Sequence, residues 1–497
     1  MRLSRWSGAA LVLSFSLIAT AQLRAQSANV TYTDTQVDPT AYVVGSDRAD
    51  ILTLTLATGA ATQSGVISST GLGSVVKDGA GNLLLSAANT FAGSTTVSAG
   101  TLTLGNALAL QNTSLDTTGA GAYSFGTLTT ATVGGLIGSG PLSLTNDSAQ
   151  AVSLTINSNL NASTNFTYSG VLSGSGSVIK TNNGAGAFVI FTGNNTYTGG
   201  TTITAGGIFV DTASGLGSGS INLNGGRLGA NTGSVTLANN LTLNADSKLG
   251  SNTTSLTLSG NFVLAATREL NVIGTTGVTS ISGVISETGG PRVFIKTGTG
   301  ELDLLGANTY TGGTLISAGT VKINNSSGSA FGTGAVTVAS GATLTGAGTF
   351  TGALQVNGTY SPGNSPALVS EPGDITIGST GLLEMQIGGL VRGTDYDALA
   401  VGGTFTAGGT LSVSLLNSFT PGAGATFDLF DWGTLHGTFA TLDLPALSDG
   451  LVWDTSALYT TGSLSVSAIP EPATYAVIFG GLALAGVMLV RRPRQKA

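Results

Sequence analysis

The sequence predicts an all-β fold, a right-handed parallel β-helix or solenoid that ends in a C-terminal β cap. Short segments alternate Leu, Val or Ile with Thr or Ser, for example residues 52–56 and 152–156. A period of two places one face of a strand in a core and the other in water. Turn signals such as Gly-Asn, Asn-Gly and Gly-Gly punctuate these segments throughout, and no helical period survives between the two ends of the chain.

A solenoid suits a chain with few charges, because stacked rungs satisfy their backbone groups along the long axis. With about 22 residues per rung and a rise of about 4.8 Å, residues 26–361 would form about 15 rungs. In such a rung we expect Leu84 to lie in the core and Lys77 to be an exposed charge. A series of β-sandwiches is the alternative fold that the pattern leaves open.

Internal repeats support the solenoid. Three copies lie at about residues 65–104, 170–210 and 283–323. Each copy opens with Gly-Val-Ile-Ser or Gly-Val-Leu-Ser, continues through one lysine to an Asn-Thr-aromatic element, and closes with a small turn and an apolar strand. The repeated lysines are Lys77, Lys180 and Lys296, the repeated aromatic residues are Phe91, Tyr197 and Tyr310, and the position after the closing turn is Thr101, Gly207 and Thr320.

Composition limits the chemistry that the chain can perform. Of 497 residues 76 are Gly, charged residues are 8%, Cys is absent and His436 is the one histidine. Absent thiols exclude disulfides and thiolate sites, and a single histidine leaves little acid–base or transition-metal chemistry. Between positions 26 and 469 the chain has 10 basic and 23 acidic residues, which argues against nucleic acid as a partner.

Candidate catalytic and metal residues are sparse. Two acidic pairs stand at i, i+2, Asp395 with Asp397 and Glu301 with Asp303, and this spacing would place both carboxylates on one strand face, where they could hold Ca²⁺. A solvated strand face is the plainer interpretation. Hydrolysis of a glycosidic bond would need two carboxylates across a cleft, and we expect no catalytic residue, no cofactor and a surface position for His436.

Residues 1–25 read as a secretory signal peptide. Arg2 and Arg5 precede an apolar run over residues 8–19, and small residues offer cleavage after Ala21 or Ala25. The run is short for a membrane span. We therefore expect an N-terminal signal helix and an exported chain.

The C-terminal end predicts a membrane helix followed by a basic stop. Residues 473–490 contain no charge and would span about 27 Å as a helix, close to the hydrocarbon thickness. The positive-inside rule keeps the following tail in the cytoplasm. The tail's basic residues are Arg491, Arg492, Arg494 and Lys496.

Pro470, Glu471 and Pro472 stand immediately before this span and form an extended stretch that suits a protease cleft. The order Pro-Glu-Pro, apolar span, arginine cluster resembles the PEP-CTERM sorting signal of Gram-negative bacteria. The resemblance covers about residues 470–497. It implies recognition by an exosortase, passage through the inner membrane, export to the cell envelope and an association with extracellular polysaccharide.

The repeated Asn-Thr-Tyr-Thr-Gly-Gly-Thr element, followed by Ala-Gly-Thr and an apolar strand, resembles the autotransporter-associated β-strand repeat of bacterial passenger domains. Residues 358–366 resemble the segment that ends such passengers. An autotransporter would continue into a membrane β-barrel, which we do not expect here. The resemblance implies a passenger-like rod.

From position 362 to 469 the composition changes. This part contains ten acidic residues and one basic residue, Arg392, together with Trp432 and Trp453. Because a solenoid needs an atypical end to cover its last core layer, we expect an acidic β capping domain at 362–469.

These observations predict an exported, non-enzymatic rod at the cell surface or in the extracellular matrix of a Gram-negative bacterium, with a structural or adhesive role. A second possibility is a carbohydrate-binding module that uses Phe91, Tyr197 and Tyr310, which would otherwise plug turns of the solenoid. A polysaccharide lyase or glycosidase is the third.

Overall fold

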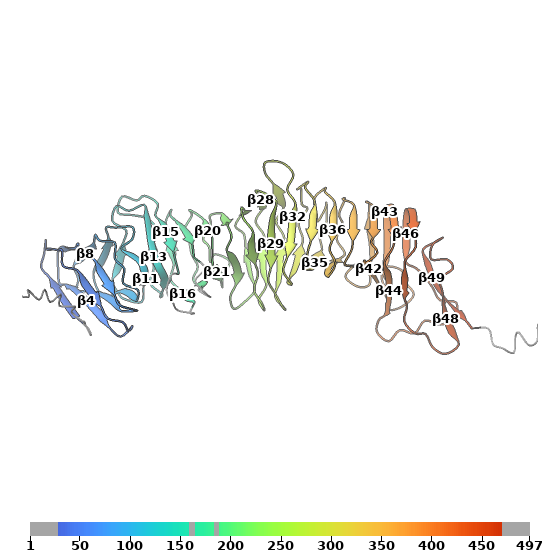
Figure 1. Cartoon of the computed structure of the whole chain (residues 1–497), viewed down its shortest axis with the longest axis horizontal. Helices are drawn as coiled ribbons and strands as arrows, with labels where there is room; N and C mark the ends of the chain where they lie inside the picture. The colour runs from blue at the N-terminus through green and yellow to red at the C-terminus, as the bar shows by residue number, and fades with distance from the viewer. Residues whose placement is uncertain (1–27, 159–164, 183–187, 470–497) are drawn as a thin grey trace, which may run out of the picture.

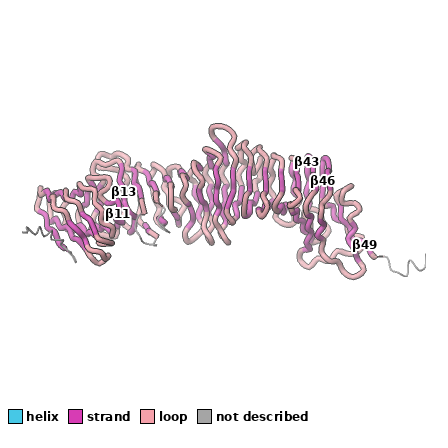
Figure 2. Tube along the Cα trace, viewed as in Figure 1, coloured by secondary structure: helices cyan, strands magenta, loops and turns pink. Residues whose placement is uncertain are grey.

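The chain forms a long rod in which parallel β-strands stack rung upon rung (Figure 1). The computed structural model describes residues 28–158, 165–182 and 188–469. Within these ranges every regular element is a β-strand, and loops join the strands along the whole rod (Figure 2). The prediction of an all-β parallel solenoid is confirmed, and the β-sandwich alternative is wrong because the long ladders are parallel.

The first sheet runs along the N-terminal two thirds of the rod. Hydrogen bonds between neighbouring rungs join residues that are 20 to 24 positions apart, close to the predicted length of a rung. Its 13 strands, in spatial order, are β1 (Ala28–Tyr32), β4 (Ile51–Leu56), β7 (Ser74–Asp78), β9 (Ser94–Val97), β11 (Leu110–Asp116), β13 (Thr130–Ile137), β15 (Ser153–Ile156), β18 (Ser177–Lys180), β20 (Thr201–Ile203), β22 (Ile221–Leu223), β25 (Leu241–Leu243), β28 (Phe262–Leu264) and β31 (Ile285–Glu287).

The second sheet starts in the middle of the chain and reaches the C-terminal end of the rod. Its 14 strands are β16 (Phe166–Tyr168), β19 (Phe188–Phe191), β21 (Gly207–Val210), β23 (Arg227–Ala230), β26 (Ser247–Leu249), β29 (Arg268–Val272), β32 (Phe294–Thr297), β34 (Thr314–Ile316), β36 (Val336–Val338), β38 (Leu354–Val356), β41 (Ile375–Ile377), β43 (Ala398–Ala407), β40 (Leu368–Glu371) and β46 (Phe430–Gly437), of which the last two both pair with β43.

A third sheet begins later still. Its 10 strands are β24 (Val235–Leu237), β27 (Leu256–Leu258), β30 (Val278–Ile281), β33 (Glu301–Leu304), β35 (Gly319–Ile323), β37 (Ala342–Gly346), β39 (Thr359–Pro362), β42 (Leu382–Ile387), β44 (Thr410–Leu415) and β47 (Thr441–Asp443). The pairing of β39 with β42 carries the parallel ladder across the predicted domain boundary at 361/362.

Four shorter sheets accompany these three long ones. An N-terminal sheet contains β2 (Val37–Asp38), β5 (Ala60–Gln63), β8 (Asn82–Leu85), β10 (Thr101–Leu104) and β12 (Ala122–Ser124), and two strand pairs join β3 (Tyr42–Val44) to β6 (Ile67–Ser69) and β14 (Leu142–Ser143) to β17 (Leu172–Ser173). At the other end β45 (Thr426–Asp428), β49 (Ser463–Ala468) and β48 (Leu451–Asp454) form an antiparallel sheet.

One continuous hydrophobic core fills the rod, because alternate residues of each strand point inward. Strand β4 shows the pattern, with Leu52, Leu54 and Leu56 at most 2% exposed. The expectation that Leu84 belongs to this core is wrong. On β8 the buried residues are Leu83 and Leu85, and Leu84 between them lies on the outer face.

Both ends of the sequence lie outside the described residues. This applies to the signal peptide at 1–25, the span at 473–490 and its basic tail. Among residues 28–158, 165–182 and 188–469, no helix has the length and apolar character needed to cross a bilayer.

Candidate functional site

The asparagine of the Asn-Thr-aromatic element ties three rungs together. Asn89 Oδ1 accepts a hydrogen bond from the amide of Ile67 at 2.8 Å, and its Nδ2 donates to the carbonyl of Ala109 at 3.1 Å. Asn195 and Asn308 bond in the same way to the preceding and following rungs. All three side chains are buried. The repeated asparagine is therefore a structural bridge, since a buried amide needs its partners.

The repeated aromatic residue plugs the same turn. Phe91, Tyr197 and Tyr310 are at most 1% exposed, and the Tyr197 and Tyr310 hydroxyls share hydrogen bonds with Thr201 and Thr314 at 2.5 and 2.6 Å. The hypothesis that these three rings are exposed platforms for carbohydrate is wrong, because a fully buried ring offers no face to a sugar.

The repeated lysine is buried as well, which corrects the expectation that Lys77 is an exposed charge. Lys77, Lys180 and Lys296 are each 0% exposed. Lys77 Nζ donates to the carbonyls of Gly79 at 2.7 Å and Ala99 at 3.0 Å, among others. Burial lowers the pKa of Lys180 and of Lys296 to about 8. The ammonium groups thus satisfy carbonyls that a turn leaves unpaired.

The outer faces of the three repeats differ, although their inner residues match. Each repeat places two neighbouring strands on the surface, β8 with β10, β19 with β21, and β33 with β35, and the same residue positions pair in each case. These strand pairs belong to three different sheets. The residues at outward positions are Asn82, Leu84, Thr101 and Thr103 in the first repeat, Phe188, Ile190, Gly207 and Phe209 in the second, and Glu301, Asp303, Thr320 and Lys322 in the third. Of these, Thr103, Ile190 and Gly207 are themselves buried by their neighbours.

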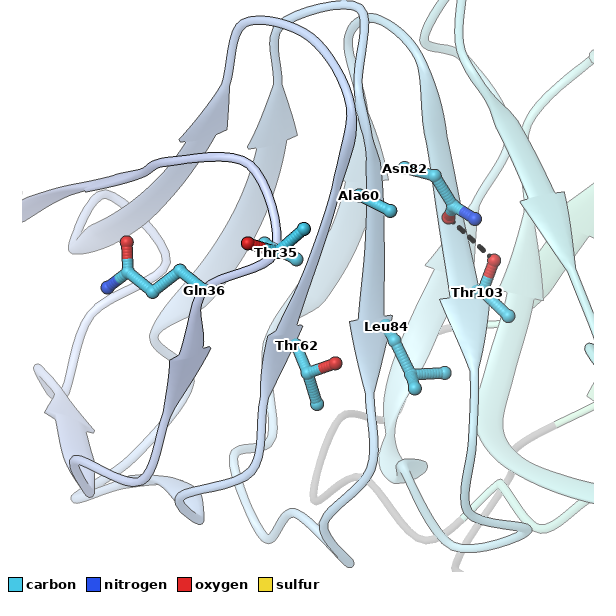
Figure 3. Close-up of a pocket in the computed structure, with 8 residues that line it drawn as sticks. Thr35, Gln36, Ala60, Thr62, Asn82, Leu84 and Thr103 are labelled. Carbon is cyan, nitrogen blue, oxygen red and sulfur yellow. Dashed lines mark hydrogen bonds between the residues drawn. The ribbon is translucent and has the colours of Figure 1, made fainter.

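The first repeat borders a shallow, uncharged groove of about 280 Å³ on the N-terminal sheet. Figure 3 shows Thr62, Leu84 and Thr103 on adjacent strands of this sheet, with Thr103 Oγ1 donating a hydrogen bond of 2.7 Å to Asn82 Oδ1. The lining residues are Thr35, Gln36, Ala60, Ala61, Thr62, Asn82, Leu84 and Thr103. Three threonines, Gln36 and Asn82 carry hydroxyl or amide groups and no lining residue is charged, so this groove presents hydrogen-bonding groups without charge.

Comparison with known families agrees with this repeat geometry. The passenger-associated-transport-repeat matches at residues 75–104, 181–208 and 294–323. The chain carries three passenger-associated transport repeats. Each match lies inside one of the three blocks expected from self-similarity, and each contains the buried aromatic plug and the first strand of the outer pair. The resemblance to passenger-type repeats is thereby confirmed.

A curated relative points the same way. The adhesin BmaC autotransporter of Brucella suis biovar 1 (strain 1330) is 29% identical to this chain over 268 residues, which are 52% of this chain and 7% of that adhesin. The chain therefore covers a small part of the relative's length. The similarity identifies a passenger-type repeat solenoid distantly related to an autotransporter adhesin.

Beyond the passenger repeats, the acidic pair Asp395 and Asp397 does not share a strand face as expected, because Asp395 lies in a turn before β43. Asp395 Oδ2 accepts the amides of residues 390–391, and Asp397 accepts those of Ala367 and Gln386 at 2.8 Å each. Burial raises the pKa of Asp397 to about 6. In the described part of the chain no three His, Asp or Glu side chains gather as metal ligands. Calcium binding at this pair stays a prediction.

Of the other predicted site residues, only His436 lies within the described residues. His436 is exposed on β46. The sorting motif Pro470, Glu471 and Pro472 lies outside the described residues, as do Arg491, Arg492, Arg494 and Lys496. The burial of the three repeated lysines was not predicted from the sequence. The signal was present, because Lys77 shares the inward parity of Val75 on β7.

Proposed function

We propose that the protein is an exported, non-enzymatic rod that acts in adhesion at the surface of a Gram-negative bacterium. The observation that carries this proposal is the contrast between the two faces of the passenger repeats. Inward Asn, Lys and aromatic residues recur in all three copies, whereas outward positions change from amide and hydroxyl to aromatic to charged groups. A scaffold that keeps its core and varies its surface is suited to presenting contacts.

The similarity to an adhesin supports this role. So does the distribution of acidic side chains in the repeats, where the outward pair Glu301 and Asp303 comes from one short strand. Glycoside hydrolysis needs carboxylates on opposite sides of a cleft. Two carboxylates side by side on one strand are therefore explained better by a contact on the surface of a rod than by a hydrolytic active site.

Deletion of the gene tests the adhesive role. We expect the deletion strain to lose attachment to glass and to sister cells, and complementation with the full-length gene to restore it. Surface display is checked by protease shaving of intact cells. Normal attachment of a deletion strain, alongside a wild type that displays the protein, would contradict the proposal.

We further propose that the Pro470-Glu471-Pro472 motif directs processing by an exosortase-type enzyme. The apolar residues 473–490 would hold the chain in the inner membrane while the basic tail stays in the cytoplasm. The extended motif would then stand at the periplasmic surface of the inner membrane, within reach of a membrane-embedded protease. The N-terminal signal would be removed after Ala21 or Ala25.

Replacement of the three motif residues by alanine separates sorting from simple anchoring. The apolar length is unchanged, so insertion should persist, while the full-length species should accumulate in the inner membrane. The measurement is mass spectrometry of the C-terminus with cell fractionation, in a host that encodes an exosortase. A mature extracellular protein that still carries residues 473–497 would replace sorting with permanent anchoring.

A further inference from the structure

The second passenger repeat carries a groove of about 260 Å³ that has a different chemistry from the one in Figure 3. Its floor is aromatic, with Phe188 on β19 and Phe209 on β21 in edge-to-face contact at 4.8 Å between ring centres. Around the floor stand Asn165, Arg227, Asn252 and Thr253. The groove is smaller than sites for drug-sized ligands, which run from roughly 300 to 1,000 Å³, so it suits one small polar unit.

Two glycines make room for the rings. A Cβ at Gly207 would lie 2.8 Å from Cδ1 of Phe188, and a Cβ at Gly229 would lie 2.7 Å from Cε1 of Phe209. The first and third repeats have Thr101 and Thr320 where the second has Gly207. The departure of the second repeat from the shared pattern therefore coincides with the placement of a ring on the surface.

Arg227 completes the floor with a positive charge. Its guanidinium carbon lies 4.9 Å from the centre of the Phe209 ring and 5.8 Å from that of Phe188, within the range of a cation–π contact. Nε and Nη2 both donate to the carbonyl of Gly250, at 3.0 and 2.9 Å. These two bonds and the ring contacts fix the guanidinium in place.

No acidic side chain of the described residues forms an ion pair with this guanidinium. Within the described residues the ion pairs all belong to Arg392, and Nη1 of Arg227 has no hydrogen-bond partner there. Lys248, exposed on β26, stands directly beside Arg227 in the register of the second sheet. Arg227 thus borders the aromatic floor with a donor that has no partner among the described residues, which matches the chemistry of a carboxylate ligand, and Lys248 adds a second positive charge one strand farther along the sheet.

Polar side chains line the rim. Asn252 and Thr253 are exposed, and their side chains make no hydrogen bond within the described part of the chain. Asn165, also exposed, uses Oδ1 to accept the amide of Phe188 at 3.3 Å, and its Nδ2 has no hydrogen-bond partner among the described residues. Amide and hydroxyl groups of this kind can pair with hydroxyls of a ligand.

We infer that this groove binds a uronic acid unit of an acidic polysaccharide. The apolar C–H face of the sugar would lie on Phe188 and Phe209, its carboxylate would accept from Arg227, and its hydroxyls would pair with Asn252 and Thr253. The inference rests on the proposed adhesive role and names the class of molecule that the rod holds. One sugar unit would bind with a dissociation constant on the order of 1 mM, and a polymer would gain from multiple contacts.

Affinity electrophoresis of the purified full chain tests the inference. Gels would contain polygalacturonate, alginate or hyaluronate, and matched gels would contain methyl-esterified polygalacturonate, in which the carboxylate is blocked. We expect the three acidic polysaccharides to retard the wild-type protein and the ester to leave its migration unchanged. Migration unaffected by all three acidic polysaccharides, or equal retardation by the ester, would overturn the inference.

Three variants locate the site. Arg227→Gln removes the charge, Phe209→Thr installs the residue of the first repeat, and Gly207→Thr restores the residue of the other two repeats and displaces the Phe188 ring. Each should weaken binding about tenfold or more. Lys322→Gln in the third repeat is the matched control, since it removes one positive charge from an outward position elsewhere and should bind as the wild type does.

The variant results separate the two parts of the inference. Far-UV circular dichroism and a denaturation midpoint confirm that each variant is folded, and Gly207→Thr is compatible with the fold because threonine stands at this position in the other repeats. Full binding by Gly207→Thr and Phe209→Thr would place the ligand elsewhere. If Gly207→Thr and Phe209→Thr bind more weakly while Arg227→Gln binds fully, the recognition of a carboxylate by Arg227 would be overturned. The attachment assay judges adhesion independently of the groove.

Discussion

Buried polar residues hold neighbouring rungs of the solenoid in register. Asn308 accepts the amide of Ile285 at 2.7 Å and donates to the carbonyl of Ala330. The Ile285 amide belongs to β31, the last strand of the first sheet, so no further strand of that sheet receives it, and Ala330 lies in a turn. A side chain that bonds to both adjacent rungs replaces the missing ladder bonds, and it leaves no buried donor or acceptor unpaired.

We predict that Asn308→Ala lowers the free energy of unfolding by about 2–3 kcal/mol, because it strands a buried amide and a buried carbonyl. Asn252→Ala is the control, since Asn252 is exposed and a surface change should stay within about 0.5 kcal/mol. Urea denaturation of both variants checks the prediction. Equal midpoints for the two variants would contradict the bridging role.

A buried carboxyl near the C-terminal end of the rod makes stability depend on pH. Glu371 is 1% exposed, accepts one amide from Phe350 at 3.1 Å, and leaves Oε1 without a described partner, as does the hydroxyl of Tyr360. Burial raises the pKa of Glu371 from 4.5 to about 8. Between these values the folded state keeps a proton that the unfolded chain has lost, so the contribution of Glu371 to stability falls as pH rises from about 4.5 and levels off above about 8.

We predict that the free energy of unfolding of the wild type, measured by urea denaturation, decreases by on the order of 1–2 kcal/mol as the pH is raised from 6 to 7.5. The urea midpoint should decrease with it. Asp397, with a pKa of about 6, contributes mainly below this window. Glu371→Gln should flatten the profile because the amide does not titrate. A wild-type midpoint that rises or stays constant across the window would show that Glu371 ionises normally.

At the scale of single elements, parity along a strand decides which residue stabilises the rod. Strand β8 contains three consecutive leucines, of which Leu83 and Leu85 are buried and Leu84 is half-exposed. A run of identical apolar residues contains no alternation, so the sequence does not reveal its inward face. Only pairing with β5 and β10 fixes it.

We predict that Leu83→Ala costs about 2–5 kcal/mol of stability, because it removes a fully buried side chain. Leu84→Ala, one position along the same strand, should cost less than about 1 kcal/mol, since Leu84 is already half in water. Denaturation midpoints of the two variants give the comparison. A larger loss for Leu84→Ala would reverse the register assigned to β8.

At the scale of the whole molecule, the rod is a one-dimensional stack. Residue 201 pairs with 221, and 221 pairs with 241, in successive strands of the first sheet. In such a stack each rung contacts only its neighbours, so stability is approximately a sum over rungs and their interfaces. A complete rung is therefore a removable unit.

We predict that deletion of residues 221–240 leaves a folded, protease-resistant rod, because Leu241 then stacks where Ile221 did. Deletion of residues 221–230 removes half a rung and should abolish cooperative unfolding, since the following strands lose their partners. Limited proteolysis and circular dichroism compare the two. Similar behaviour of both deletions would contradict stacking in units of one rung.

The sequence alone determined the β-solenoid, the approximate length of a rung and the positions of the three repeats. Alternation of Leu with Thr and the spacing of turn residues are local properties, and local properties survive in a linear string. The sequence also predicted that the repeated aromatic residues could plug turns, because Asn-Thr-aromatic elements recur at a fixed place in each copy.

Only the tertiary structure decided what each repeat presents to solvent. The lysines resemble surface charges in sequence, yet carbonyls from the adjacent turn and the next rung surround Lys296. The groove at Phe209 and Arg227 joins residues of successive rungs with the loop at 252–254, a proximity that no local pattern records. Register between rungs creates these contacts, and register depends on the packing of the whole core rather than on any one strand.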